Sequence, residues 1–424
     1  MMNQPLLGLD QALTPALRDA ILTPLRAGVV PAQGLGYFQV GREAEISTLN
    51  RDVERLLQGG GAARFIVGPY GSGKTFTRQL LRTNALSRGL VVISADLSPE
   101  RRLHASSGSQ ARTLYAELMR SLATRARPQG QALGSVVERF ILATLRQGHL
   151  QGQEAQQALL ARLSPFEEYP GGFDFIEVIQ HYWRGLEQGK LAWQKAALRW
   201  LRAEYPTLSE ARKALPVHSI IDSGNLYGAL KLWNEFVRLA GYPGMLVLLD
   251  EVATLTEISH SQSRLNNYNQ LLTLINETWL GTAAGLGFMF FATPELLEHP
   301  KRGIAALPAL QARLQENRFA QLGFTDVSGP VVRLQPLGEL EIDRLLKHLR
   351  HIQALGQPGD YQLSDVELWN VLIACRKHFG SDYYANPRLT IKTFLDILAL
   401  LEQNPTLSLQ TLLQGLLQDL SRSQ

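Results

Sequence analysis

Apolar residues fall into two patterns along this chain: short unbroken runs and longer stretches with helical spacing. Each short run is bounded by glycine or by a polar residue, which is typical of a strand buried on both faces. The runs that predict strands are ARFIVGP at 63–69, GLVVISADLS at 89–98, MLVLLD at 245–250, GFMFFAT at 287–293 and VVRLQPL at 331–337. Strands that alternate with helices favour a parallel sheet with crossover helices.

Helical spacing fills most of the remaining chain. Thr14 followed by Pro15 predicts a helix that reaches about Gly28, because threonine caps helices and proline is tolerated in their first turn. A second helix is predicted to begin near Glu43 and to end at QGGG, 58–61. Residues 99–240 are almost entirely helical in pattern, with breaks at RPQGQALG, SPFEEYPGGFDF and EYPTLSEARKALPVHS. After residue 337, helices are predicted to begin near Glu339, Ser364, Asn386 and Leu407.

A glycine-rich loop stands between the first predicted strand and a helix that begins near Lys74. Its sequence GPYGSGKT, 68–75, fits the phosphate-binding pattern G-x-x-x-x-G-K-[ST]. Glycines let the backbone N–H groups face phosphate oxygens, the lysine supplies a positive charge, and the hydroxyl of Thr75 can bind Mg²⁺. The following helix also presents the positive end of its dipole to an anion. The predicted nucleotide-binding residues here are Gly68, Pro69, Tyr70, Gly71, Ser72, Gly73, Lys74, Thr75 and Phe76.

Two adjacent carboxylates end the strand MLVLLD, and they favour hydrolysis over mere binding. The carboxyl ends of parallel strands face the ligand crevice. Asp250 is placed to hold Mg²⁺, and Glu251 is placed to orient and deprotonate an attacking water. A general base typically contributes 10²–10⁴-fold to a rate. An acidic pair at a strand end is common, so the prediction depends on its occurrence together with the phosphate loop.

Three further positions are candidates for the same chemistry. Thr293 ends the strand GFMFFAT and could hydrogen-bond the attacking water or the γ-phosphate. Arg313 and Arg318, just before the last strand, could each reach the γ-phosphate bound to a neighbouring subunit, and each could equally be a surface charge on a helix. Arg388 lies in the first turn of a helix, where a cation is usually disfavoured unless an anion compensates it.

Composition changes this picture little. Hydrophobic residues make up 45% of the chain, charged residues 19%, and the net charge is +4, an ordinary globular balance. The positive charge is concentrated between Pro99 and Gly130. This segment contains two glutamates and six arginines: Arg101, Arg102, Arg112, Arg120, Arg125 and Arg127. With the sequence pI of about 9.1, this segment is a candidate DNA-contacting face, and a solvated helix surface is the equal alternative.

The cysteine count, the N-terminal residues and the length of the apolar runs limit the classes of protein to which this chain could belong. One cysteine, Cys375, excludes an intramolecular disulfide and a cysteine-based zinc site, and its helical apolar surroundings predict a buried thiol. The N-terminal residues lack the basic and apolar regions of a signal peptide, and no apolar run reaches membrane-spanning length. We therefore expect a cytoplasmic protein with no membrane partner.

In this order, the motifs resemble those of the AAA+ ATPases. By that resemblance Gly68–Thr75 is the Walker A motif, Asp250 and Glu251 are Walker B, and Thr293 is sensor 1. Arg313 or Arg318 is the arginine finger, and Arg388 within NPR is sensor 2 in a helical lid. The upstream FQVGREAEISTL is similar to a box that helps to seat adenine in related ATPases, which implicates Val40, Gly41 and Arg42. The resemblance thus implies ATP and Mg²⁺ as ligands and a homo-oligomer as the active form.

A narrower resemblance covers most of the chain. LRAGVVPAQGLGYFQVGREAE, ISADLSPERRLHASSGSQARTLYAELMRSLATRARPQG and PALQARLQENRFA are similar to the ATP-binding proteins of BREX-type phage-defence systems, of the BrxD kind. Such ATPases act beside a helicase or other defence partners. Two features depart from the usual AAA+ pattern: a helical insertion of roughly 140 residues precedes Walker B, and the chain ends soon after the lid. The second departure puts autonomous recognition of duplex DNA in doubt.

These observations predict an α/β protein of two or three domains. We expect a parallel-sheet P-loop core of AAA+ type, a long helical insertion and a C-terminal all-helical lid. The predicted division is 1–98 for the N-terminal helix and the first part of the core, 99–240 for the insertion, 241–336 for the second part of the core, and 337–424 for the lid. Four of the six tryptophans, at 183, 193, 200 and 233, lie in the insertion and are predicted to pack in its core.

The leading hypothesis is an ATP-hydrolysing protein of antiviral defence that remodels a partner protein or nucleic acid. The alternative is a nucleotide-dependent switch or scaffold, with slow hydrolysis, that recruits a helicase or nuclease. A helicase motor is disfavoured because no second motor domain is evident, and it would require a ring of subunits.

Overall fold

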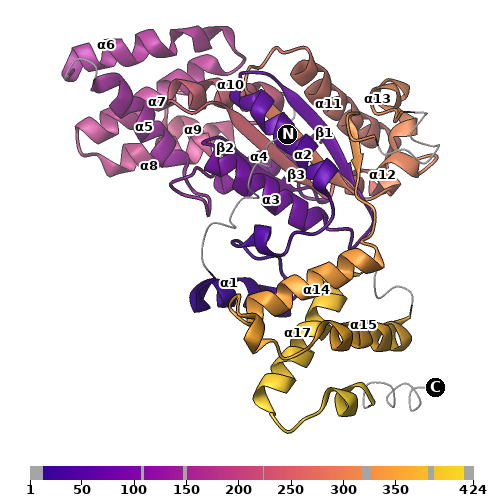
Figure 1. Ribbon diagram of the computed structural model, residues 1–424. Helices are drawn as coiled ribbons and strands as arrows, with labels where there is room; N and C mark the ends of the chain where they lie inside the picture. The colour runs from indigo at the N-terminus through magenta and orange to yellow at the C-terminus, as the bar shows by residue number, and fades with distance from the viewer. Residues whose placement is uncertain are drawn as a thin grey trace. The chain divides into compact units, whose positions relative to one another are not determined.

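The computed structural model describes residues 13–106, 109–146, 150–222, 224–317, 326–380 and 386–414 (Figure 1). Its chain divides into two compact units, each assembled from segments that are distant in sequence. Unit 1 comprises Met1–Ser47, Gly68–Leu81 and Arg333–Gln424, and unit 2 comprises Thr48–Val67 and Arg82–Val332. The four-part division expected from the sequence stays a prediction.

A five-stranded sheet forms the centre of unit 2. Its order is β2-β3-β4-β1-β5, and the pairs β2/β3, β3/β4 and β4/β1 are parallel. The strands are β1 Ala62–Val67, β2 Val91–Asp96, β3 Met245–Asp250, β4 Leu286–Ala292 and β5 Val331–Arg333. Every residue of β3 and β4 is buried, as their unbroken apolar sequences predict. The predicted α/β fold with a parallel sheet is confirmed.

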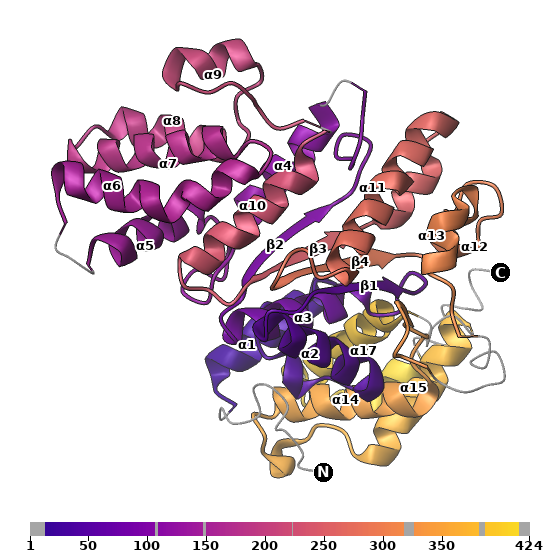
Figure 2. The same cartoon turned by 90° about the horizontal axis from the view of Figure 1, so that it is seen from above.

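Helices cover both faces and both edges of this sheet. Within unit 2, α5 to α8 gather toward the β2 edge, while α11, α12 and α13 gather on the side of β4 and β1 (Figures 1 and 2). α4 packs on β2, and α11 packs on β1 and β4. The helices of unit 2 are α4 Ser109–Ser121, α5 Leu133–Leu145, α6 Gly152–Leu163, α7 Gly172–Glu187, α8 Leu191–Leu201, α9 Leu208–Ala214, α10 Leu226–Leu239, α11 Ser261–Trp279, α12 Glu295–Glu298 and α13 Pro308–Arg313.

The helical block between β2 and β3 differs from its sequence prediction in two details. The segment EYPTLSEARKALPVHS, predicted as a break, contains α9, which begins because the Thr207 side chain accepts a hydrogen bond from the Glu210 N–H. Of the four tryptophans predicted to be core, Trp183, Trp200 and Trp233 are buried. Trp193 is half-buried, with the Lys190 ammonium 4.0 Å from its ring centre.

Unit 1 is a helical assembly with its own apolar core. Its helices are α1 Pro15–Arg26, α14 Glu339–Gln353, α15 Asp365–Phe379 and α17 Pro387–Gln403, while α2 Glu43–Leu57 and α3 Lys74–Ser87 have residues in both units. Thr14 is the predicted cap of α1, and Ser364 and Asn386, where helix starts were predicted, are also caps: each of the three side chains accepts an N–H from the first turn of the following helix. Leu80 of α3 is buried in the same core as α1, α14, α15 and α17, and so is the thiol of Cys375.

Candidate functional site

The phosphate-binding sequence forms the predicted loop between β1 and α3. Gly71 and Gly73 have φ angles of 83° and 89°, in the left-handed region that favours glycine. A side chain at Gly68 is excluded by crowding, since a Cβ there would lie 2.4 Å from the Ser72 Oγ and 2.7 Å from the Leu334 backbone oxygen. The loop backbone therefore has the conformation and close packing for which its glycines were expected, as a phosphate cradle requires.

Lys74 begins α3 and lies back over the loop. Its Nζ donates to the backbone oxygens of Gly68, at 2.6 Å, and Pro69, at 3.0 Å. The ammonium also lies 5.2 Å from the centre of the Tyr70 ring, which is 78% exposed. Thr75 is exposed beside it. The positive charge is thus held at the mouth of the loop, where an anionic group would meet it.

Phe76 and Val40, both predicted to contact nucleotide, are partly buried against the core of unit 1. The Phe76 ring lies 5.4 Å from the ring of Phe38 in an edge-to-face arrangement, and both Phe76 and Val40 contact the unit 1 core. Their side chains contribute to holding the start of α3, since aromatic pairs of this kind add stability beyond their buried area.

Arg42 contacts the phosphate loop itself. Its Nη2 donates to the Ser72 backbone oxygen at 2.9 Å and also to the Gln335 backbone oxygen. Burial lowers the pKa of this guanidinium, opposed by the nearby carboxylates of Glu45 and Glu341. Gly41 has a φ of 58°, and a Cβ there would lie 2.3 Å from the Glu341 Oε1. The segment around Gly41 and Arg42 therefore packs between the phosphate loop and helix α14.

The acidic pair lies at the carboxyl end of the sheet in unit 2. Asp250 is the last residue of β3 and is buried, and its Oδ1 accepts the N–H of Glu251 at 2.8 Å. Glu251 has φ 54° and ψ 35°, a left-handed conformation that costs a residue with a Cβ roughly 1–2 kcal/mol. Such strained residues concentrate at functional sites.

The sheet order adds a relationship that the sequence does not show. β4 lies between β1 and β3, so Thr293, which follows β4, stands between the strand that leads into the phosphate loop and the strand that ends in Asp250. Thr293 is 5% exposed and lies just beyond the strand in which it was predicted. On the other side of β3, Asp96, the last residue of β2, is the Cα partner of Asp250. Asp96 was missed, although ISAD ends in a carboxylate as MLVLLD does.

The candidate arginines have different surroundings. Arg313 ends α13, and its Nε donates to the Asn276 Oδ1 at 3.0 Å. Arg318 lies outside the described residues. Arg388 is in the first turn of α17, as predicted, with its side-chain stem against Gly28, where a Cβ would lie 3.3 Å from the Arg388 Cδ.

The arginines between residues 101 and 127 do not share one uniform surface. Arg112 donates to the Pro206 backbone oxygen, and Arg120 forms an exposed ion pair with Glu117 at 2.8 Å. Arg125 and Arg127 are exposed in the turn after α4. This part of unit 2 is basic but partly engaged in local contacts, so DNA contact stays a prediction.

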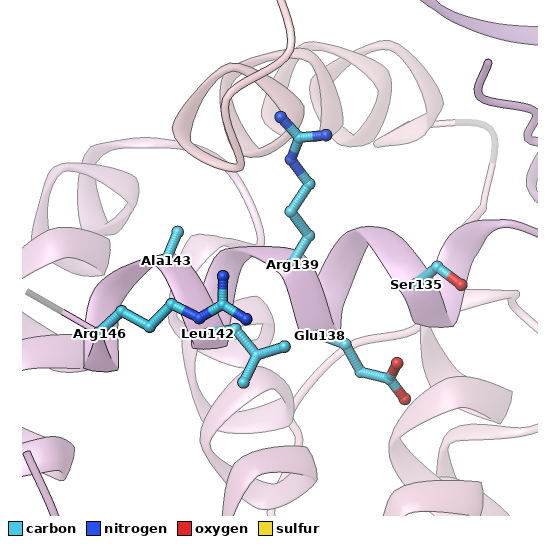
Figure 3. Close-up of a pocket in the computed structure, with 6 residues that line it drawn as sticks. All are labelled: Ser135, Glu138, Arg139, Leu142, Ala143 and Arg146. Carbon is cyan, nitrogen blue, oxygen red and sulfur yellow. The ribbon is translucent and has the colours of Figure 1, made fainter. Parts of the chain in front are cut away.

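A hollow of about 410 Å³ lies on α5, away from every predicted site residue. Figure 3 shows Arg139 and Glu138 extending from this helix in opposite directions. Arg139 donates to the Ala240 and Gly241 backbone oxygens and stacks on Tyr242, and Glu138 accepts the Tyr182 hydroxyl at 2.8 Å. These bonds attach α5 to neighbouring segments. Arg139 and Glu138 therefore support the packing of the helices, and they do not indicate a reactive site in the hollow.

Two features are absent from the described part of the chain. Within it, no group of three or more histidine, cysteine, aspartate or glutamate side chains is arranged to hold a metal ion. None of the helices described there is long and apolar enough to cross a membrane.

A comparison with protein families identifies a match. The model of a family described as BREX system ATP-binding protein BrxC/D matches residues 13–416, nearly the whole chain. No curated protein matches this sequence. The family description thus agrees with the ATP binding that the sequence of the phosphate loop predicts.

Proposed function

This chain belongs to the family of BREX system ATP-binding proteins BrxC/D, and on that premise we propose that it binds and hydrolyses ATP within a phage-defence system. The membership supports ATP binding and a defence role. Hydrolysis, and its coupling to a partner protein or nucleic acid, form our proposal. A cytoplasmic location is part of it.

ATP phosphates bind the loop Gly68–Thr75 in this proposal. Its backbone N–H groups and the N-terminus of α3 face the phosphates, and the Lys74 ammonium neutralises them. The Thr75 hydroxyl and the Asp250 carboxylate are the oxygen ligands that Mg²⁺ prefers. Magnesium bound there would neutralise charge on the β- and γ-phosphates.

Glu251 is the general base in this proposal, and its backbone conformation is the observation that carries the assignment. A left-handed glutamate directly after a buried strand is costly, so a role for its carboxylate best explains a glutamate at this position. The base takes the proton of a water that attacks the γ-phosphorus, and Thr293 orients that water.

Substitution of Glu251 tests this assignment. Glu251→Gln should retain ATP and lower its turnover at least about 100-fold, the lower range for loss of a general base. Lys74→Ala should abolish ATP binding, and Glu257→Gln, an exposed carboxylate six residues on, serves as the matched control. Turnover at the wild-type rate in Glu251→Gln would refute the base, and absence of hydrolysis in wild-type protein, with and without DNA, would refute the enzyme.

We further propose an AAA+ arrangement in which a neighbouring copy completes the site. Residues 337–424 act as the lid, Arg388 as sensor 2, and Arg313 or Arg318 as the finger; the core and its insertion divide as 1–98, 99–240 and 241–336. In a homo-oligomer of this kind, turnover per subunit rises with protein concentration. The rise should disappear in Arg313→Ala or in Arg318→Ala, which identifies the finger.

A nucleotide-dependent switch is the second candidate, and one contact favours it. The Arg313 side chain is bonded within its own chain to Asn276, rather than displayed for a neighbour. Slow turnover that is independent of protein concentration would support this candidate, with ATP controlling recruitment of a helicase or nuclease. DNA contact through the 101–127 segment is a separate proposal, and an affinity for DNA that does not change with salt would exclude phosphate contacts.

A further inference from the structure

Arg42 joins two backbone segments that are far apart in sequence. Its guanidinium donates to the oxygen of Ser72, in the phosphate loop, and to the oxygen of Gln335, in the linker that leads to α14. Its side chain is only 9% exposed. Both bonds come from Nη2, and arginine suits this position because its planar guanidinium holds its N–H donors in a fixed fork.

The same linker packs against the other end of the loop. The Leu334 backbone oxygen lies where a side chain at Gly68 would need to be, and it would be 2.7 Å from a Cβ there. Between these points the Ser72 hydroxyl is buried, with 1% of the residue exposed, and among the described residues its Oγ has no hydrogen-bond partner. The loop is thus bounded by the linker at Gly68 and tied to it through Arg42 at Ser72.

The contacts around Arg42 continue into α14. The Glu341 Oε2 accepts the Gly338 N–H at 2.6 Å at the start of that helix, and its Oε1 faces Gly41. Arg42 itself has a left-handed φ of 72°, held at the start of α2 by the bond from the Ile46 N–H to its backbone oxygen. Both ends of the arginine are therefore fixed.

We propose that Arg42 is a positioning residue that ties the phosphate loop to the linker before α14. Loss of Arg42 should therefore weaken the binding of the phosphate groups of a nucleotide, and not the binding of its base. The inference rests on the proposed ATP site. It differs from the adenine-seating role that the resemblance implied for Val40, Gly41 and Arg42, because the observed bonds of Arg42 go to the loop backbone.

An adenine-free probe separates the two roles. Binding of ATP, GTP and inorganic tripolyphosphate is measured for wild-type protein, Arg42→Ala and Arg42→Lys. We expect Arg42→Ala to weaken all three by a similar factor, about 10-fold or more, the range for loss of a hydrogen bond to a charged group. Arg42→Lys keeps the charge without the fork and should fall between. Arg51→Ala, which changes an exposed arginine of α2 that is bonded to Thr48, is the control.

A second measurement guards against a variant that merely folds poorly. Tripolyphosphate should slow hydrogen exchange of the Leu337 and Gly338 amides in wild-type protein and not in Arg42→Lys at equal occupancy. Loss of ATP affinity with unchanged tripolyphosphate affinity would overturn the proposal in favour of adenine contact, and unchanged affinity for all three would overturn it outright. Wild-type protein that binds none of the probes would instead refute the ATP site.

Discussion

Val67 at the end of β1 and Ala292 at the end of β4 are Cα partners in the sheet. The strand that leads into the phosphate loop therefore ends level with the strand that leads into Thr293. In this register Thr293 is the polar residue that follows β4, the strand next to β1. The motif that ends in Thr293 is the least specific of the sequence motifs, and the register gives it a defined position.

Thr293→Val should reduce turnover and leave ATP affinity nearly unchanged. Valine keeps the shape of the buried side chain and removes its hydroxyl, so the expected loss is about 2- to 10-fold, the range of one neutral hydrogen bond. Steady-state ATPase rates and equilibrium binding measure the two effects. Thr256→Val, also buried and bonded to the Ala253 oxygen, is the control; equal effects of both substitutions would contradict a specific role for Thr293.

Glu251→Asn should stabilise the protein while stopping hydrolysis. Asparagine adopts the left-handed conformation more readily than other residues with a Cβ, whereas glutamine does not. We expect Glu251→Asn to unfold at higher urea concentration than Glu251→Gln, by roughly 0.5–1 kcal/mol in unfolding free energy. Chemical unfolding followed by circular dichroism gives the comparison. Equal stability of the two variants would remove the evidence for strain at Glu251.

Asp52→Ala should be strongly destabilising. Asp52 and Arg64 form a buried ion pair, with side chains 2% and 12% exposed, and Arg64 also donates to the Ser328 oxygen at 3.0 Å. Removal of the carboxylate leaves a buried cation, which costs about 3–5 kcal/mol. Glu117→Ala breaks the exposed pair with Arg120 and should cost less than about 1 kcal/mol. Similar losses in both variants would contradict this ranking.

Stability of the C-terminal helices should decline at acid pH through Asp365. A hydrogen bond from Arg350 lowers the pKa of this carboxyl, helped by the charges of Arg350 and Lys347. Because the folded pKa lies below the unfolded value of about 3.9, the stabilisation is complete above the unfolded pKa and is lost as pH falls from there through the folded pKa. The urea midpoint of wild-type protein should therefore drop more steeply between pH 5 and 3 than that of Asp365→Asn. Parallel curves would refute this contribution.

Local sequence features predicted the strands, the helix caps and the phosphate loop because each depends on neighbouring residues. A buried strand needs only its own apolar run, and Thr14, Ser364 and Asn386 cap helices through N–H groups three residues away. The capping sequence TLSE before α9 had the same local logic, and it was hidden by the prolines that flank it.

Contacts between residues that are distant in the chain, and the order of the strands in the sheet, could not be predicted from the sequence. The position of β4 between β1 and β3 depends on how crossover helices pack, and no residue pattern specifies it. Asp96 becomes a candidate site residue only once its pairing with Asp250 is known. The contact of Arg42 with Gln335 joins residues 293 positions apart, so only the folded chain reveals it.

The core of unit 1 has a consequence for synthesis on the ribosome. Leu80, near the phosphate loop, is buried among residues such as Leu346 and Phe394, which emerge more than 250 residues later. Chains are made from the N-terminus at about 5–20 residues per second, so the helix after the loop waits at least several seconds for these partners. A nascent chain therefore carries its phosphate-loop sequence long before it can hold that loop rigidly, and the loop becomes rigid only after the helices between Glu339 and Gln403 have emerged.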